Sequence, residues 1–96
     1  MNTKPGTRVC AILKMDNETV LLFGYGTYTG DEVPPKEAIG FNIGIPCPKI
    51  ALDNGKTVYG CECWWSTQER VENMIGARTI VMVDIDQLRK EQPNQQ

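Results

Sequence analysis

The dipeptide Asn54-Gly55 constrains this chain more than any other feature, because it separates two segments of alternating apolar and polar residues. Both central residues of a type I′ turn have positive φ, and Asn and Gly reach that conformation most cheaply. The pattern predicts a β-hairpin with a two-residue loop. In that register Asp53 faces Lys56, and Ile50 faces Tyr59.

The predicted register also assigns the side chains to the two faces of the hairpin, since neighbours on a strand point to opposite faces. The face with the better core residues carries Ile50, Leu52, Tyr59, Cys61, Cys63 and Trp65. The two tryptophans are therefore expected to point in opposite directions. Trp65 is predicted to be buried, and Trp64 to be exposed beside Glu62.

Length and charge limit the class of protein. A chain of 96 residues predicts one domain over residues 1–96, with frayed ends at 1–6 and 92–96. No apolar run approaches the ~20 residues of a membrane span, and the N-terminus lacks an apolar leader, so we expect a cytoplasmic protein and no membrane partner. A net charge of −2 disfavours nucleic acid as a partner.

The chain contains no histidine, which removes the commonest general base and metal ligand. The remaining acids and thiols form no recognisable catalytic set. We therefore favour a protein that is not an enzyme, without catalytic residues or a cofactor.

The four cysteines are Cys10, Cys47, Cys61 and Cys63. Their spacing does not match the paired C-x₂₋₄-C knuckles of a structural zinc site. Without a secretory leader, disulfides are not expected either. We expect no metal site, and we interpret the cysteines as small buried apolar residues.

The rest of the chain predicts a mainly β fold with one short helix (α+β). Apolar patterns indicate strands over residues 7–14, 19–25 and 78–85, in addition to the hairpin. Ser66 and Glu69 form a capping-box pattern that predicts a helix over residues 67–75, ending at Gly76. Short helical turns are expected at 36–39 and 86–91. About five strands favour a small curved antiparallel sheet or a partly open barrel.

Glycines alternate with aromatic residues and threonines in residues 24–32. Glycine in a strand indicates a bend, a bulge or close approach of another backbone or a ligand. One interpretation is a curved strand that ends at Gly30-Asp31. The other is a ligand-facing strand in which Tyr25 or Tyr28 stacks on a planar group.

Two blocks, GYGTYTGDEVPP (residues 24–35) and DNGKTVYGCECWW (residues 53–65), resemble a family of small proteins of bacteria and their phages. The resemblance implies a cytoplasmic, phage-encoded setting. It implies no activity and supplies no catalytic residues.

These features favour a small binding module that binds or sequesters a polar, nucleotide-like small molecule. Aromatic residues would stack on the ligand, carboxylates would accept hydrogen bonds, and an arginine would meet an anionic group. The candidate ligand-binding residues are Tyr25, Tyr28, Asp31, Glu62, Trp64 and Arg78, and the other candidate cations are Arg8, Lys49 and Arg70.

An alternative is an assembly subunit that acts on a host protein through Trp64 and the loop at residues 39–48. An open sheet also has unpaired edges, so we expect a homo-oligomer. Base stacking by a small barrel is the least favoured alternative, because the chain is acidic.

Overall fold

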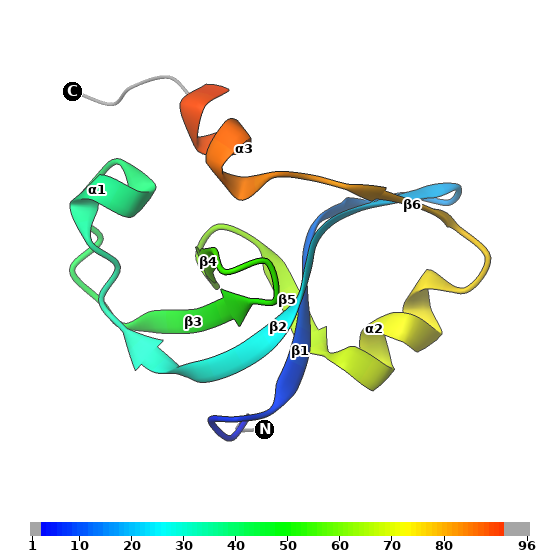
Figure 1. Ribbon diagram of the computed structural model, residues 1–96, viewed down its shortest axis with the longest axis horizontal. Helices are drawn as coiled ribbons and strands as arrows, with labels where there is room; N and C mark the ends of the chain where they lie inside the picture. The colour runs from blue at the N-terminus through cyan, green and yellow to red at the C-terminus, as the bar shows by residue number, and fades with distance from the viewer. Residues whose placement is uncertain (1–2, 92–96) are drawn as a thin grey trace.

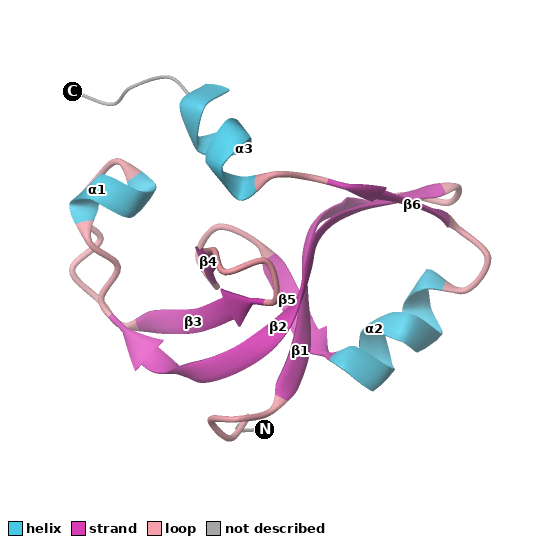
Figure 2. Ribbon diagram, in the orientation of Figure 1, coloured by secondary structure: helices cyan, strands magenta, loops and turns pink. Residues whose placement is uncertain are grey.

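The computed structural model describes residues 3–91, and it is organised around one long strand. This strand, β2, belongs to an open sheet of six strands with a few short helices, so the predicted mainly β fold with a curved sheet is confirmed (Figures 1 and 2). The strands are β1 (Arg8–Met15), β2 (Thr19–Glu32), β3 (Cys47–Leu52), β4 (Thr57–Tyr59), β5 (Trp64–Thr67) and β6 (Thr79–Met82). The helices are α1 (Lys36–Ile39), α2 (Gln68–Ile75) and α3 (Ile85–Glu91).

The sheet order is β4-β3-β2-β1-β5, with all of these neighbours antiparallel. Strand β6 pairs in parallel with the first residues of β2, from Thr19 to Leu22. One edge of β2 is therefore shared by two strands, β6 at its start and β3 at its end. Figure 1 shows β1 and β2 running side by side from β3 to β6.

The β1–β2 hairpin forms for local reasons. The Asp16 carboxylate accepts hydrogen bonds from the Glu18 and Thr19 backbone N–H groups at 2.8 Å each, as an Asx turn does. These bonds lower the pKa of Asp16. Both faces of the hairpin are buried, which explains why β2 is apolar on both sides.

Two apolar clusters cover the two faces of this hairpin. On one face α2 packs Val71 and Ile75 against β1 and β2. On the other face, side chains of β1 to β4 and of the start of α3 form a second cluster; it contains Val9, Ala11, Phe23, Tyr28, Ile50, Leu52, Val58 and Ile85. The two clusters give this 96-residue chain a core on each side of the sheet.

The predicted register of the β3–β4 hairpin is wrong by one residue. Ala51 pairs with Thr57, and Ile50 pairs with Val58 instead of Tyr59. The loop has three residues, 53–55, because the Leu52 N–H donates to the Lys56 carbonyl at 2.8 Å. Only Gly55 has positive φ, +90°, as in a type I turn followed by a glycine bulge.

The predicted exposure of the tryptophans is confirmed, although the register behind it is not. Trp64 is 45% exposed, whereas Trp65 is half-buried and packs against the core. The strand stops after Tyr59, the chain turns at residues 60–63, and both tryptophans belong to a separate strand, β5.

The predicted capping residue of α2 is also wrong by one position. Thr67, not Ser66, caps the helix, and its hydroxyl accepts from the Arg70 N–H at 3.4 Å. Ser66 instead pairs with Cys10 within the sheet. None of the helices within residues 3–91 combines the length and the apolar character that a membrane span requires. Of the ends predicted to fray, residues 1–2 and 92–96 lie outside the described residues. Within the predicted N-terminal end, the Gly6 N–H is held by a hydrogen bond to the Tyr28 carbonyl at 2.7 Å.

Candidate functional site

A hollow on the surface surrounds the contact between Tyr28 and Trp65. The two rings stack with centroids 5.4 Å apart and planes 17° apart. The hollow has a volume of about 590 Å³ and is lined by Thr3, Tyr28, Asp31, Pro48, Trp65, Ser66 and Arg70. We call it the Tyr28–Trp65 cleft. Its volume lies within the ~300–1,000 Å³ of small-molecule sites, and it is open to solvent.

A bulge in β2 brings Tyr28 and Asp31 together. Residues three apart on a regular strand point to opposite faces, but the pairing of β2 with β3 is interrupted between these two residues. Gly30 within the bulge has φ +109°, which favours glycine. The Tyr28 hydroxyl donates to the Asp31 carboxylate at 2.6 Å. This hydrogen bond raises the pKa of Tyr28.

Gly60 lies closely against both Trp65 and Pro48. A Cβ atom on Gly60 would lie 2.8 Å from Pro48 Cδ and 3.0 Å from Trp65 Nε1. Only a residue without a side chain allows this close approach. The indole and the proline ring therefore form a rigid wall, which favours binding because little is lost in ordering it.

The cleft also contains one charge of each sign. Asp31 lies at one side, and Arg70 projects from the first turn of α2. Within residues 3–91, the Arg70 guanidinium makes no side-chain hydrogen bond or ion pair, so its donors are available to an incoming anion.

The structure distributes the predicted ligand-binding residues over several places. Tyr28 and Asp31 meet in the cleft. Tyr25 packs against the α2 side of the sheet and lines a separate hollow of about 240 Å³ with Gly24, Leu52 and Met82. Trp64 lies on β5, opposite Ile12 on β1.

Glu62 holds α3 against the sheet. Its carboxylate accepts two hydrogen bonds from the Arg89 guanidinium, at 2.6 and 2.8 Å, and one from the Tyr59 N–H at 3.0 Å. Only 14% of the Glu62 side chain and 21% of the Arg89 side chain are exposed. The carboxylate thus has partners inside the fold.

The Arg78 side chain is also engaged in hydrogen bonds within the fold, at the end of α2. Its side chain donates to the backbone carbonyls of Asp16 at 2.6 Å and of Met74 at 2.6 Å. These bonds satisfy a carbonyl of the last helical turn and tie the helix to the β1–β2 turn.

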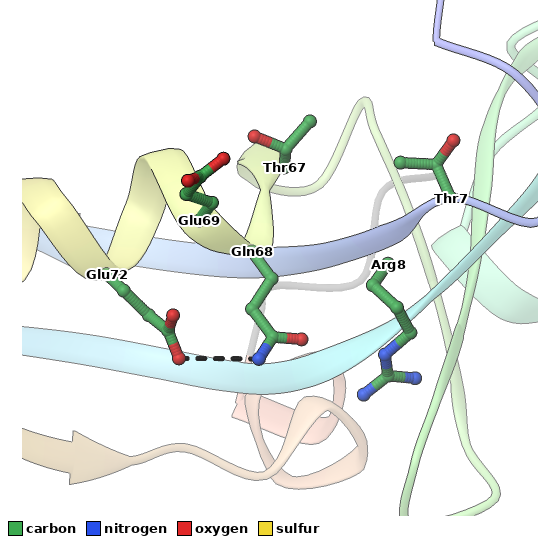
Figure 3. A pocket seen from close by; sticks show the side chains of 6 residues that line it. All are labelled: Thr7, Arg8, Thr67, Gln68, Glu69 and Glu72. Atoms are coloured by element: carbon green, nitrogen blue, oxygen red, sulfur yellow. Dashed lines mark hydrogen bonds between the residues drawn. The ribbon is translucent and has the colours of Figure 1, made fainter.

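A second polar hollow of about 370 Å³ lies at the start of α2 and is lined by Thr7, Arg8, Thr67, Gln68, Glu69 and Glu72. In Figure 3 the side chains of Gln68 and Glu72 point toward each other, and their hydrogen bond is 3.3 Å long, whereas Glu69 points away. Arg8 pairs with the Asp53 carboxylate at 2.6 Å. This hollow lacks an aromatic wall, and its cation is already engaged.

The thiols in the core are poor nucleophiles. Burial raises the pKa of Cys10 and of Cys63 to about 12. In the described part of the chain, no group of three His, Cys, Asp or Glu residues is placed to hold a metal ion. The arrangement in the Tyr28–Trp65 cleft is suited to binding a ligand by stacking, hydrogen bonding and charge.

Sequence reasoning named Arg70 only as one of several cations and excluded Trp65 as a core residue. The signal that could have identified Trp65 is Gly60, which marks a close approach.

Comparisons with models of protein families, with curated proteins and with solved structures gave no match.

Proposed function

We propose that the protein is a non-enzymatic binding module that sequesters a small planar anion in the Tyr28–Trp65 cleft. The observation that carries the proposal is the Arg70 guanidinium, which has no side-chain partner among residues 3–91, beside a rigid aromatic wall. We further propose that it works in the cytoplasm, where its four free thiols stay reduced.

The ligand chemistry follows from the groups in the cleft. The half-buried Trp65 indole offers a surface for a planar ring, with Pro48 beside it. The Arg70 guanidinium would bind a phosphate or carboxylate in a bidentate manner. Asp31 would accept a hydrogen bond from a ring N–H or a sugar hydroxyl. A nucleotide-like molecule carries all three kinds of group.

The test is a titration of the full chain with nucleoside mono- and diphosphates, monitored by tryptophan fluorescence and calorimetry. Loss of a hydrogen-bonded charge from one partner costs about 1.5–3 kcal/mol, so Arg70→Gln should weaken binding about tenfold or more. Lys90→Gln removes an equal charge from an exposed position on α3 and should leave the affinity unchanged. Equal affinities of Arg70→Gln and the native chain would refute the assignment of the cleft.

A second candidate function is self-assembly through β6. All four residues of this strand are exposed, including Ile80 at 48%, Val81 at 43% and Met82 at 62%. An exposed apolar edge strand is a surface for pairing with another strand. We propose a second copy of this chain as the partner.

The backbone of β6 favours that partner. The Thr79 N–H donates to the Glu18 carbonyl, just before β2, at 2.9 Å, and the Val83 N–H donates to the Leu22 carbonyl of β2 at 2.8 Å. By alternation, the backbone groups of Ile80 and Met82 point to the open edge. An antiparallel pair centred on Val81 would join Ile80 of one copy to Met82 of the other, and it would bring Arg78 opposite Asp84 at both ends.

Light scattering over a range of concentrations tests this assembly. The native chain should form dimers, and Val81→Lys should be a monomer, because two ammonium groups would meet on the symmetry axis. Val33→Lys is the matched control, since Val33 is 48% exposed and follows the last residue of β2, whereas β6 pairs with the first residues of that strand. A native chain that is monomeric at all concentrations would exclude the assembly.

A further inference from the structure

The corrected register of the β3–β4 hairpin brings Cys47 and Cys61 close together across the hairpin. Lys49 pairs with Tyr59, and the Gly60 N–H donates to the Pro48 carbonyl at 2.7 Å. Strand β4 ends at Tyr59, and continuing its register by two positions into the following turn brings Cys61 to the position opposite Cys47. In the two-residue-loop register predicted from the sequence, Cys47 would have faced Glu62 instead.

The hydrogen bonds of the ladder show which kind of pair the cysteines form. The bonds from Leu52 to Lys56 and from Gly60 to Pro48 mark the hydrogen-bonded positions of the ladder. Cys47 and Cys61 flank the last of these bonds, and in a continued ladder they would form a non-hydrogen-bonded pair, whose Cα atoms are about 4.5 Å apart. That separation falls within the range of about 4.4–6.8 Å that a disulfide needs.

The two thiols differ in accessibility. The Cys47 thiol donates to the Ile45 carbonyl at 3.7 Å, and its proximity contributes to the raised pKa of Cys61. Cys61 is exposed, whereas Cys47 is only 5% exposed. This arrangement provides one sulfur that a reagent can reach and a second sulfur that can attack the first.

We propose that Cys47 and Cys61 are a reversible dithiol–disulfide pair that reacts by thiol–disulfide exchange with small-molecule disulfides. The Cys61 thiolate attacks one sulfur of the small disulfide, forms a mixed disulfide and releases one thiolate. The Cys47 thiolate then attacks Cys61 Sγ, forms the Sγ–Sγ bond and releases the second thiolate. Two protein thiols lose two electrons and two protons, and the small disulfide becomes two thiols.

The exchange is slow at neutral pH. Burial raises the pKa of Cys61 to about 11, with smaller contributions from Cys47 and Glu62. Since the thiolate is the attacking form, the rate should rise about tenfold per pH unit between neutrality and that pKa. The pair therefore responds to sustained oxidation.

The other two cysteines supply the contrast. Cys10 is 0% exposed within the α2-side cluster. Cys63 is half-buried, and its thiol donates to the Tyr59 carbonyl at 3.5 Å. Cys61 and Cys63 are two positions apart in the same turn, so among the four cysteines only Cys47 lies across the hairpin from Cys61.

The experiment is oxidation of the reduced full chain with oxidised glutathione, followed by alkylation, intact mass and peptide mapping. The expected product is two hydrogens lighter, with one bridge between Cys47 and Cys61. Closure of a loop of about 15 residues should raise the Tm by about 10–20 °C. Reduction should reverse both changes.

Variants identify the roles of the two sulfurs. Cys47→Ser should accumulate the glutathione adduct at Cys61 at a level on the order of tenfold above the native chain, because no neighbouring thiol displaces it. Cys63→Ser is the matched control and should oxidise like the native chain. As a measurement on the unmodified sequence, phenylarsine oxide should bind with one equivalent per chain and block the oxidation.

Three results would overturn the proposal. They are a bridge between Cys61 and Cys63, a stable glutathione adduct on the native chain, and a Tm that falls on oxidation. The last would mean that the bridge requires distortion of the ladder.

Discussion

The ion pair between Glu62 and Arg89 should contribute strongly to stability, and Arg89→Met tests this directly. The substitution keeps the aliphatic length of the side chain and removes the guanidinium. It deletes two hydrogen bonds to Glu62 and one to the Thr57 carbonyl at 3.2 Å. The Glu62 carboxylate would keep only the Tyr59 N–H.

The expected magnitude follows from the burial of the pair. Exposed ion pairs contribute about 0–1 kcal/mol, whereas breaking a fully buried pair on one side costs about 3–5 kcal/mol. With side-chain exposures of 14% and 21%, this pair lies closer to the buried limit. We expect Arg89→Met to lower the free energy of unfolding by about 2–3 kcal/mol, or the Tm by about 10–20 °C.

Urea denaturation monitored by circular dichroism measures this loss, and a double-mutant cycle with Glu62→Gln isolates the interaction between the two side chains. Lys56→Met is the matched control, because Lys56 pairs with Asp84 at 2.7 Å but both side chains are at least 36% exposed. That control should lose less than about 1 kcal/mol. Equal losses in the two variants would refute the argument from burial and would leave Glu62 available for a role in ligand binding.

Three further predictions concern the sheet and its turns. Gly26→Ala should destabilise the fold by about 1–3 kcal/mol or more in urea denaturation, because the new Cβ would lie 2.4 Å from the Ala51 carbonyl oxygen. A loss below about 0.5 kcal/mol would contradict the β2–β3 pairing. Gly55→Ala should lower the free energy of unfolding by about 1 kcal/mol, since Gly55 has φ +90°. Asn54→Ala should cost less, because it removes only the 2.9 Å hydrogen bond from the Lys56 N–H. A larger loss for Asn54→Ala than for Gly55→Ala would support a type I′ loop. The hydrogen bond from Arg8 lowers the pKa of Asp53, so this bond stabilises the fold above the ordinary pKa of 3.8, and the stabilisation is lost as the pH falls through the lower folded-state pKa. Asp53→Asn should therefore reduce the loss of stability at acidic pH. An unchanged acid part of the stability–pH curve would contradict this.

The error in the hairpin register has a physical reason. Asn-Gly is compatible both with a two-residue type I′ loop and with a type I turn plus a glycine bulge. Contacts distant in sequence accompany the second: the Asp53 N–H donates to the Tyr25 carbonyl at 3.0 Å, and the Asp53 carboxylate pairs with Arg8. Local propensity does not include these contacts.

The candidate site was predictable only in part for the same reason. Tyr28 and Asp31 were identified by residue type, but their meeting depends on a bulge whose only local sign is Gly30. Glu62 and Arg78 looked like free charges, because their partners lie 27 and 62 positions away. The long strands and α2 were predictable, because each carries its own apolar periodicity.

The parallel pairing of β6 with β2 has a consequence for biosynthesis. Thr79 lies sixty positions after its neighbour Thr19, so the start of β2 waits until the chain has been translated past residue 82 before that edge is covered. On the ribosome, a nascent polypeptide that ends before residue 79 would present a bare apolar ladder to other chains. Stalled or truncated translation products of this protein should therefore be the forms that depend most on chaperones.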